Sequence, residues 1–371
     1  MRVHSFRRSG NRVTATVEWE DSARGPFDLF FESSSPDLPR DGGGEAFVLA
    51  CLPIAVHHQE RRLRVDAPIC PFLQDRLEVL LGWWRQWHML RAPIVIEVNQ
   101  GETPLPSGDR QAYSFISGGF DSLHLLLRNR ERYPLHHPRR IKRSIFGHGF
   151  DLAYRPGVPD KRFAMVLPHL QAVADDAGVE LIIAESNLIM MDNDGGVWVH
   201  YLHGAALGAI AHAVIPGKAY ATIASTFDIP NLKPYGTHPS TDPCFSSERI
   251  LFSQWGETVT RLDKARELGR WPQALDHLTV CTDFQLDRLN CGRCEKCKRA
   301  WLELRAWGLS SSALDPAAVS PDELRVMVRE TTVETETHYR NLLGPLEQQG
   351  LSDHVAVMRE ELAKKQSSLA H

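Results

Sequence analysis

The sequence has no apolar run long enough to span a bilayer, and its first residues, Met1–Phe6, carry no apolar core of a signal peptide. It also has little excess charge, because 42 Lys and Arg stand against 46 Asp and Glu, for a net charge of −4. With a sequence pI of about 6.5, the chain has no overall attraction to nucleic acid or to an anionic membrane. We therefore expect a cytoplasmic protein with no membrane partner.

Cysteine is scarce outside a single cluster. The chain has seven cysteines, and four of them, Cys281, Cys291, Cys294 and Cys297, form a C-x9-C-x2-C-x2-C array. This distribution suits a reducing compartment better than a disulfide framework. Four thiolates at this spacing can close a tetrahedral shell around Zn²⁺, which fastens a loop and leaves no open position for catalysis. An iron–sulfur cluster is the alternative, although the proline that follows a ferredoxin-type run is missing, and a third possibility is four unliganded thiols.

The sequence also lacks the Gly-Lys-Ser/Thr of a Walker A loop and the third glycine of a dinucleotide-binding fingerprint. It has instead Ser117-Gly118-Gly119-Phe120-Asp121-Ser122, between the apolar run 113–116 and the amphipathic run 123–130. This order predicts a strand, a tight glycine turn and a helix start, where backbone N–H groups and the helix dipole bind phosphate oxygens. Hydroxyls of the two serines add donors, and Asp121 could hold Mg²⁺ or cap the helix. The simpler alternative is a glycine turn that only joins a strand to a helix.

On these residues the chain resembles the PP-loop ATP pyrophosphatases, which cleave ATP between the α and β phosphates. Together with the cysteine array, the loop resembles 7-cyano-7-deazaguanine synthase, a family of queuosine precursor biosynthesis, and this chain is similar to a divergent paralogue of it. The resemblance covers roughly residues 112–308 and implies a Rossmann-like α/β domain, ATP and Mg²⁺ at the loop, and Zn²⁺ on the four cysteines. It also implies a ligase reaction, in which ATP activates a carboxylate as an acyl adenylate and ammonia displaces AMP.

Four short apolar segments, each followed by polar residues, predict a parallel sheet. The segments are Tyr113–Ile116, Ser144–Gly147, Leu181–Ala184 and Ala221–Ala224. Ligands bind at the carboxyl ends of such strands, so the polar residues should meet in one crevice. The candidate nucleotide-binding residues are Ser117, Gly118, Gly119, Phe120, Asp121, Ser122, His148 and Glu185. The candidate catalytic residues are Asp121, Ser122, Asp228 and Cys244.

Composition divides the chain into three regions. Residues 1–108 are expected to form a small α+β domain, with strands at 13–19, 27–32 and 94–98 and a helix over Pro71–Met89. The resemblance implies that residues 109–308 form a PP-loop domain with a zinc-binding loop, and residues 309–371 are expected to form a helical extension that supports a homo-oligomer. Both terminal regions, and altered substrate segments at 225–228 and 235–244, depart from the synthase family. The resemblance therefore supports the activation chemistry better than the substrate.

Three functions remain open. The leading one is ATP-dependent activation of a carboxylate or carbonyl acceptor, on a small molecule or nucleobase, followed by nitrogen transfer. The second is an ATP-dependent sulfur transferase acting on a nucleobase or tRNA, because sulfur-transferring members of the superfamily use a loop cysteine, here Cys244, as persulfide carrier. In that case the basic run 139–143 would meet RNA phosphate. The third is a nucleotide-binding or protein-modifying partner in a multi-protein system, with a protein acceptor.

Overall fold

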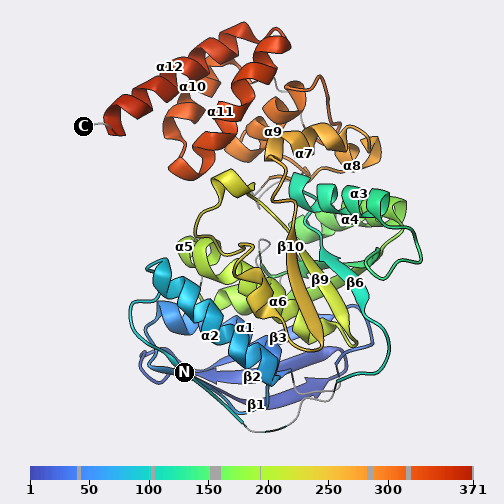
Figure 1. Ribbon diagram of the computed structural model, residues 1–371, viewed down its shortest axis with the longest axis vertical. Coiled ribbons are helices and arrows are strands. Elements are labelled where there is room, and N and C mark those ends of the chain that lie inside the picture. The colour runs from blue at the N-terminus through green and yellow to red at the C-terminus, as the bar shows by residue number, and fades with distance from the viewer. Residues whose placement is uncertain are drawn as a thin grey trace.

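The computed structural model describes residues 1–39, 43–99, 101, 105–150, 160–192, 194–281, 288–314 and 319–369. These residues form an α/β structure around one ten-stranded sheet, with a helical region at the C-terminal end (Figure 1). Six of the nine strand pairings are parallel and three are antiparallel. The expected α/β class is confirmed at this level.

The sheet runs without interruption from the C-terminal strands to the N-terminal strands. In spatial order its strands are β10 (Ile250–Trp255), β9 (Ala219–Ala224), β6 (Gln111–Phe115), β7 (Ile141–His148), β8 (Glu180–Ser186), β3 (Phe27–Ser33), β2 (Arg12–Glu18), β1 (Arg2–Ser9), β4 (Arg62–Val65) and β5 (Val95–Val98). The first five are parallel, and β3 joins them by antiparallel pairing with β8, where Phe31 lies opposite Ser186. Strands from both sides of position 108 therefore belong to one sheet.

The four strands expected for the parallel sheet are present as β6, β7, β8 and β9, each within a few residues of the predicted bounds. The N-terminal strands expected at 13–19, 27–32 and 94–98 are present as β2, β3 and β5. Three strands were not predicted: β1, β4 and the edge strand β10. The sequence of β10, Ile-Leu-Phe-Ser-Gln-Trp, follows a Pro/Ser-rich loop and shows no clear alternation.

Helices cover both faces of the parallel strands, as in a doubly wound fold. One face carries α3 (Phe120–Arg132), α4 (Lys161–Ala177), α7 (Arg261–Leu268), α8 (Pro272–Asp276) and α9 (Glu295–Arg305), which share one buried core. The other face carries α1 (Gly44–His57), α2 (Pro71–Gln86) and α6 (His203–Val214), which share a second core with the N-terminal strands. The remaining short turns are η1 (Leu188–Met190), α5 (Gly195–Val197), η2 (Trp198–Leu202), η3 (Ile229–Asn231) and η4 (Asp242–Phe245).

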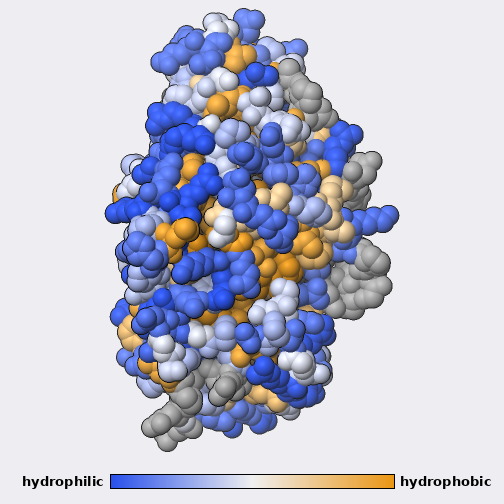
Figure 2. Space-filling model, turned by 90° about the vertical axis from the view of Figure 1, so that its right-hand side faces the viewer, coloured by the Kyte–Doolittle hydropathy of each residue, from blue (hydrophilic) through white to orange (hydrophobic). Residues whose placement is uncertain are grey.

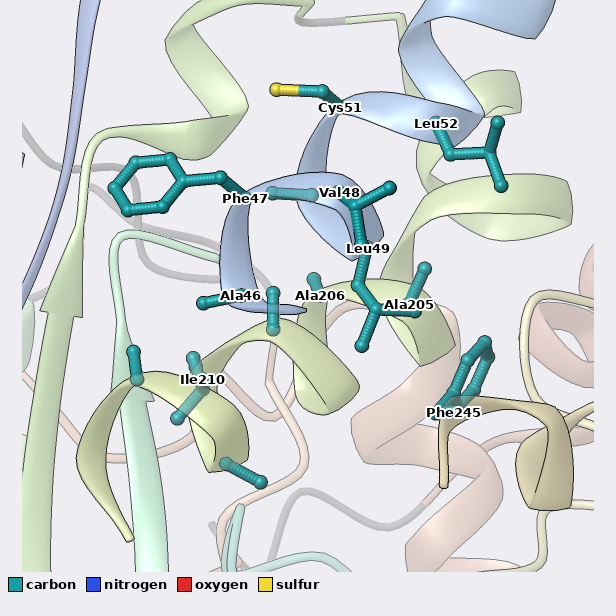
Figure 3. Packing of buried hydrophobic residues seen from close by; sticks show 14 of the residues in the cluster. Ala46, Phe47, Val48, Leu49, Cys51, Leu52, Ala205, Ala206, Ile210 and Phe245 are labelled. Carbon is teal, nitrogen blue, oxygen red and sulfur yellow. The ribbon is translucent and has the colours of Figure 1, made fainter. Parts of the chain in front are cut away.

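Helix α1 was not predicted from the sequence. Its residues from Gly44 to Val56 are all buried, so its sequence shows no polar face from which a helical period could be read. Figure 3 shows its side chains, among them Ala46 and Leu49, packed over Ala205 and Ala206 of α6. Small residues allow this close approach, and a Cβ at Gly208 would already lie 3.2 Å from the side chain of Leu49.

The C-terminal region forms three helices, α10 (Pro321–Glu330), α11 (Val333–Gln348) and α12 (Ser352–Leu369). A capping box opens α10, because Ser320 accepts from the Glu323 backbone and Glu323 reaches back to the Ser320 backbone. Buried residues of these helices, such as Leu342, pack with Leu302 of α9 and Leu262 of α7. The helical extension is thus packed onto α7 and α9.

One face of the molecule carries an apolar band at mid-height, below the C-terminal helices and bordered by polar side chains (Figure 2). Bands of this kind on a polar surface mark ligand or partner sites in many proteins. Among the described residues, no helix combines the length and the apolar character needed to cross a bilayer.

Candidate functional site

The glycine turn connects β6 to α3 as the sequence predicts, and its geometry requires glycine. Gly118 has a φ of +77°, in the left-handed region. A Cβ at this position would also lie 3.0 Å from side-chain atoms of Leu170 and Thr279. The turn is therefore held closely against α4 on one side and the segment before the cysteine array on the other.

The two serines of the turn lie against each other. Their Oγ atoms are 3.4 Å apart, and Ser122 donates a hydrogen bond to the carbonyl of Gly119 at 3.1 Å. Gly119 is the N-cap of α3 and has no side chain to cap it, so Asp121 does not serve as the cap. The first N–H groups of an α-helix have no acceptor within the helix. The start of α3 thus presents donors and a positive dipole end, the combination that binds phosphate.

The carboxylate of Asp121 is held by two cations from α7, which packs beside α3 (Figure 1). Its two oxygens each lie 3.0 Å from a donor, one from the guanidinium of Arg261 and the other from Nζ of Lys264. Burial alone would raise the pKa of Asp121, but Lys264 and Arg261 outweigh it and hold the pKa below its ordinary value. The residue is therefore a carboxylate in an ion-pair network.

Lys264 also joins two strand ends. Its Nζ donates to the carbonyl of Ser225, the first residue after β9, while it pairs with Asp121 after β6. Its side chain is only 1% exposed. Lys264 and Arg261 were not predicted as site residues, because they lie some 140 positions from the loop in sequence. The only available signal was their spacing of three on a helix, which places them on one face.

A second polar group lies at the ends of β7 and β8. Nδ1 of His148 is 2.8 Å from Glu185, and Nε2 is 3.0 Å from Asp160. The imidazole stacks on Phe163, with ring centroids 4.3 Å apart. Burial would lower the pKa of His148, but its hydrogen bonds to Glu185 and Asp160 raise it above the ordinary value. Asp160, the N-cap of α4, was not predicted as a site residue.

Asp228 comes after β9, at the same edge of the sheet, and its carboxylate accepts from the amide of Asn231 at 2.8 and 2.9 Å. Ser225, the first residue after β9, is 1% exposed, and its hydroxyl donates to the carbonyl of Phe227. The carboxyl ends of β6, β7, β8 and β9 thus carry the polar residues predicted for the crevice. Lys264 links the end of β6 to the end of β9, because it contacts both Asp121 and Ser225. His148 and Glu185 link the end of β7 to the end of β8.

Cys244 is placed differently from these residues. It lies in η4 and belongs to the core shared by α1, α2 and α6, on the opposite face of the sheet from α3. Its thiol is 2% exposed and donates to the carbonyl of Ser240 at 3.6 Å. Burial raises its pKa to about 11. A reactive carrier needs an accessible thiol with a lowered pKa, so this environment does not favour the persulfide role.

The four cysteines of the array meet in one cluster. All four Sγ atoms lie within 4.8 Å of one another, and two pairs, Cys281 with Cys294 and Cys291 with Cys297, are 3.8 Å apart. A tetrahedral site with Zn–S bonds of about 2.3 Å has sulfurs about 3.8 Å apart. Backbone N–H groups of Arg293 and Cys294 donate to the sulfur of Cys291 at 3.2 and 3.1 Å. The donor set and its spacing therefore fit a closed zinc site.

The cysteine cluster is tied directly to the glycine turn. The N–H of Thr279, two positions before Cys281, donates to the carbonyl of Gly118 at 2.8 Å. Asn290 is 2% exposed; its carbonyl oxygen accepts from Val280 and Cys281, and its amide donates to Leu278 and Ala313. The segment that supports the turn is thus fixed at one end by the cysteines and at its centre by Asn290.

The C-terminal extension also reaches this region. His338 of α11 lies face to face with Phe227, with ring centroids 6.4 Å apart, and Lys233 lies over the Phe227 ring at 4.3 Å. Burial, with Arg299 and Arg261 nearby, lowers the pKa of His338 to about 2, so its imidazole is neutral. No residue of α11 was predicted to belong to the site.

A recess of about 280 Å³ lies elsewhere, between α10 and α12. It is lined by Arg329, Glu361, Lys364 and Lys365. Glu361 already pairs with Lys364 at 2.8 Å and with Arg329 at 3.5 Å, so these charges largely satisfy one another. The recess contains none of the predicted site residues.

Comparison with known proteins returns no relative. No family model matches the chain, and neither a curated protein nor a solved structure is similar to it.

Proposed function

We propose that this protein is an ATP-dependent adenylating enzyme of the PP-loop type, which forms AMP and pyrophosphate. The observation that carries the proposal is the meeting of three features at one edge of the parallel sheet. These are the left-handed glycine turn at Gly118, the open amides at the start of α3, and the two cations Arg261 and Lys264 beside Asp121. A di- or triphosphate needs amide donors and cations together at one place.

In this proposal the turn and α3 bind the phosphates that leave as pyrophosphate. Backbone amides and the Ser117 hydroxyl donate to phosphate oxygens, while the Ser122 hydroxyl holds the turn through the Gly119 carbonyl. Lys264 and Arg261 balance the developing negative charge. Catalysis of phosphoryl or nucleotidyl transfer depends mainly on such positioning and electrostatic stabilisation. Asp121 orients the two cations, and Mg²⁺ enters with ATP.

The chemical step activates an acceptor oxygen. A carboxylate or carbonyl oxygen attacks the α phosphate, the bond to the β phosphate breaks, and pyrophosphate leaves with that electron pair. A nitrogen nucleophile then attacks the activated carbon, and AMP leaves. This scheme, similar to that of 7-cyano-7-deazaguanine synthase, needs no protein nucleophile, which agrees with the buried thiol of Cys244. Zinc on the four cysteines would be structural, because four protein ligands close its shell.

The test is release of AMP and pyrophosphate from α-labelled ATP with Mg²⁺, in the presence of 7-carboxy-7-deazaguanine, guanine, tRNA or candidate partner proteins. We expect acceptor-dependent AMP and pyrophosphate from the wild type, and loss of both in Asp121→Ala. Glu131→Gln is the matched control, since Glu131 lies on the same helix but faces solvent. Formation of ADP and phosphate, or equal product from Asp121→Ala, would contradict the proposal.

A further inference from the structure

A second cluster of metal-ligating side chains lies far from the cysteines in sequence, where α1 ends. His57 is the last residue of α1 and His58 is its C-cap. They face Asp192, in the segment between η1 and α5. Figure 1 shows α1 and α5 well below α9, which has Cys294 as its N-cap and Cys297 in its first turn. Among the described residues, this cluster and the four cysteines are the groups of three or more such donors that could share one ion.

The three donor atoms are close to the spacing of a metal site. Nε2 of His58 is 2.7 Å from Oδ2 of Asp192, Nε2 of His57 is 3.9 Å from the same oxygen, and all three atoms lie within 4.8 Å of one another. Ligands with bonds of about 2.1 Å lie about 3.0–3.4 Å apart in octahedral or tetrahedral sites. To reach this ligand spacing, Nε2 of His57 has to move closer to Asp192. The His57 side chain is 35% exposed and therefore has room to rotate.

The other two ligands are already oriented by the surrounding structure. The Asp192 side chain is 4% exposed, and its second oxygen accepts from the N–H of Asp194 at 2.9 Å. The ring of His58 packs edge-on against Trp19, with centroids 5.0 Å apart. Contacts of this kind fix the orientation of the residues that bind the metal and increase metal affinity.

We propose that His57, His58 and Asp192 form a second metal site, which takes a divalent first-row transition ion such as Zn²⁺ or Co²⁺. Two imidazoles and one carboxylate are a borderline donor set that suits these ions better than Mg²⁺ or Ca²⁺. Three protein ligands leave at least one coordination position for water or a substrate oxygen, on the exposed side at His57. The site is therefore of the open kind, unlike the cysteine cluster, and the inference does not depend on the proposed adenylation.

The test is Co²⁺ binding to the full-length protein purified with its cysteine cluster loaded with zinc. We expect one further saturable equivalent of Co²⁺ without a thiolate-to-cobalt charge-transfer band. Affinity should fall by more than about ten-fold in His57→Ala and in Asp192→Asn. His136→Ala, which removes an exposed histidine elsewhere, should bind like the wild type.

His57→Ala keeps the experiment decisive, because this side chain is exposed and its loss leaves the core intact. The proposal is overturned if no further equivalent binds, if the bound Co²⁺ shows the thiolate band, or if both ligand variants bind as the wild type does. ATP turnover is no part of the readout, so failure here and failure of the adenylation proposal are separate results.

Discussion

Lys264 is the residue on which the proposed nucleotide site most depends. Its ammonium group is buried, and it is neutralised by Asp121 while it also holds the carbonyl of Ser225. Removing one partner from a buried ion pair leaves the other charge without compensation and costs about 3–5 kcal/mol. The pair therefore serves both the fold and the site, and both effects are measurable.

We expect Lys264→Met to lower the free energy of unfolding by about 3 kcal/mol and to weaken ATP binding by about ten-fold to a hundred-fold. Urea unfolding measures the first effect and calorimetric titration with ATP the second. Arg266→Met, at an exposed position of the same helix, should change neither much. Unchanged ATP affinity in a folded Lys264→Met protein would remove Lys264 from the site.

Asp242 gives a prediction for the dependence of stability on pH. It is fully buried in η4, where it accepts from the His238 N–H and the Gln254 amide, each at 2.9 Å. Burial raises its pKa to about 8, outweighing both hydrogen bonds. The carbonyl oxygen of Gln254 is buried without a partner among the described residues. A protonated Asp242, with the Gln254 amide turned over, would donate to that oxygen.

The sign follows from proton binding. An unfolded aspartate ionises near pH 4, whereas the folded one keeps its proton to about pH 8, so the free energy of unfolding falls as pH rises between these values. Asp242→Asn removes this loss, and we expect the variant to gain stability relative to the wild type from about pH 5 to about pH 8. Urea unfolding across this range is the measurement, with the exposed Asp75→Asn as control. A constant difference between variant and wild type would contradict the assignment.

At the scale of elements, the order strand, turn, helix around the glycine loop could be predicted from sequence, because all its determinants are contiguous. The four cysteines could be predicted to meet for the same reason. Helix α1 could not, since a helix that is buried on every side has no amphipathic period. Arg261 and Lys264 could not be assigned to the loop either, because only the packing of α7 against α3 brings them to Asp121.

The link between the cysteine cluster and the turn predicts what metal removal does. Thr279 donates to Gly118 from a segment that Cys281 anchors, so release of the ion should free the turn. We expect faster hydrogen exchange at residues 117–122 and ATP binding at least about ten-fold weaker after zinc is extracted. Exchange mass spectrometry is the measurement, and added Zn²⁺ should restore protection. Extraction of zinc with unchanged exchange at the turn would show that the two sites are independent.

At the scale of the molecule, the sheet does not stop at the boundary predicted at residue 108. Strand β3 pairs with β8, and Phe31 and Phe47 share a core with Ile182 and Ile210. The sequence could not indicate this, because the linker composition of 101–108 marks a connection but does not report which strands pair across it. The C-terminal extension is likewise joined to the rest of the protein by a shared core, since buried residues of α10, α11 and α12 pack with α7 and α9.

This continuity predicts that residues 109–371 do not fold alone. Without residues 1–108, strand β8 becomes an open edge and the apolar face of α6 loses α1, and both exposures favour aggregation. We expect the 109–371 fragment to be insoluble or to lack ATP binding, and co-expression with the 1–108 fragment to recover a 1:1 complex that binds ATP. The control is the full chain cut, after folding, at a protease site inserted between 105 and 108, which should keep its affinity. Cooperative unfolding and full ATP binding by 109–371 alone would instead establish two independent domains that share a sheet only by contact.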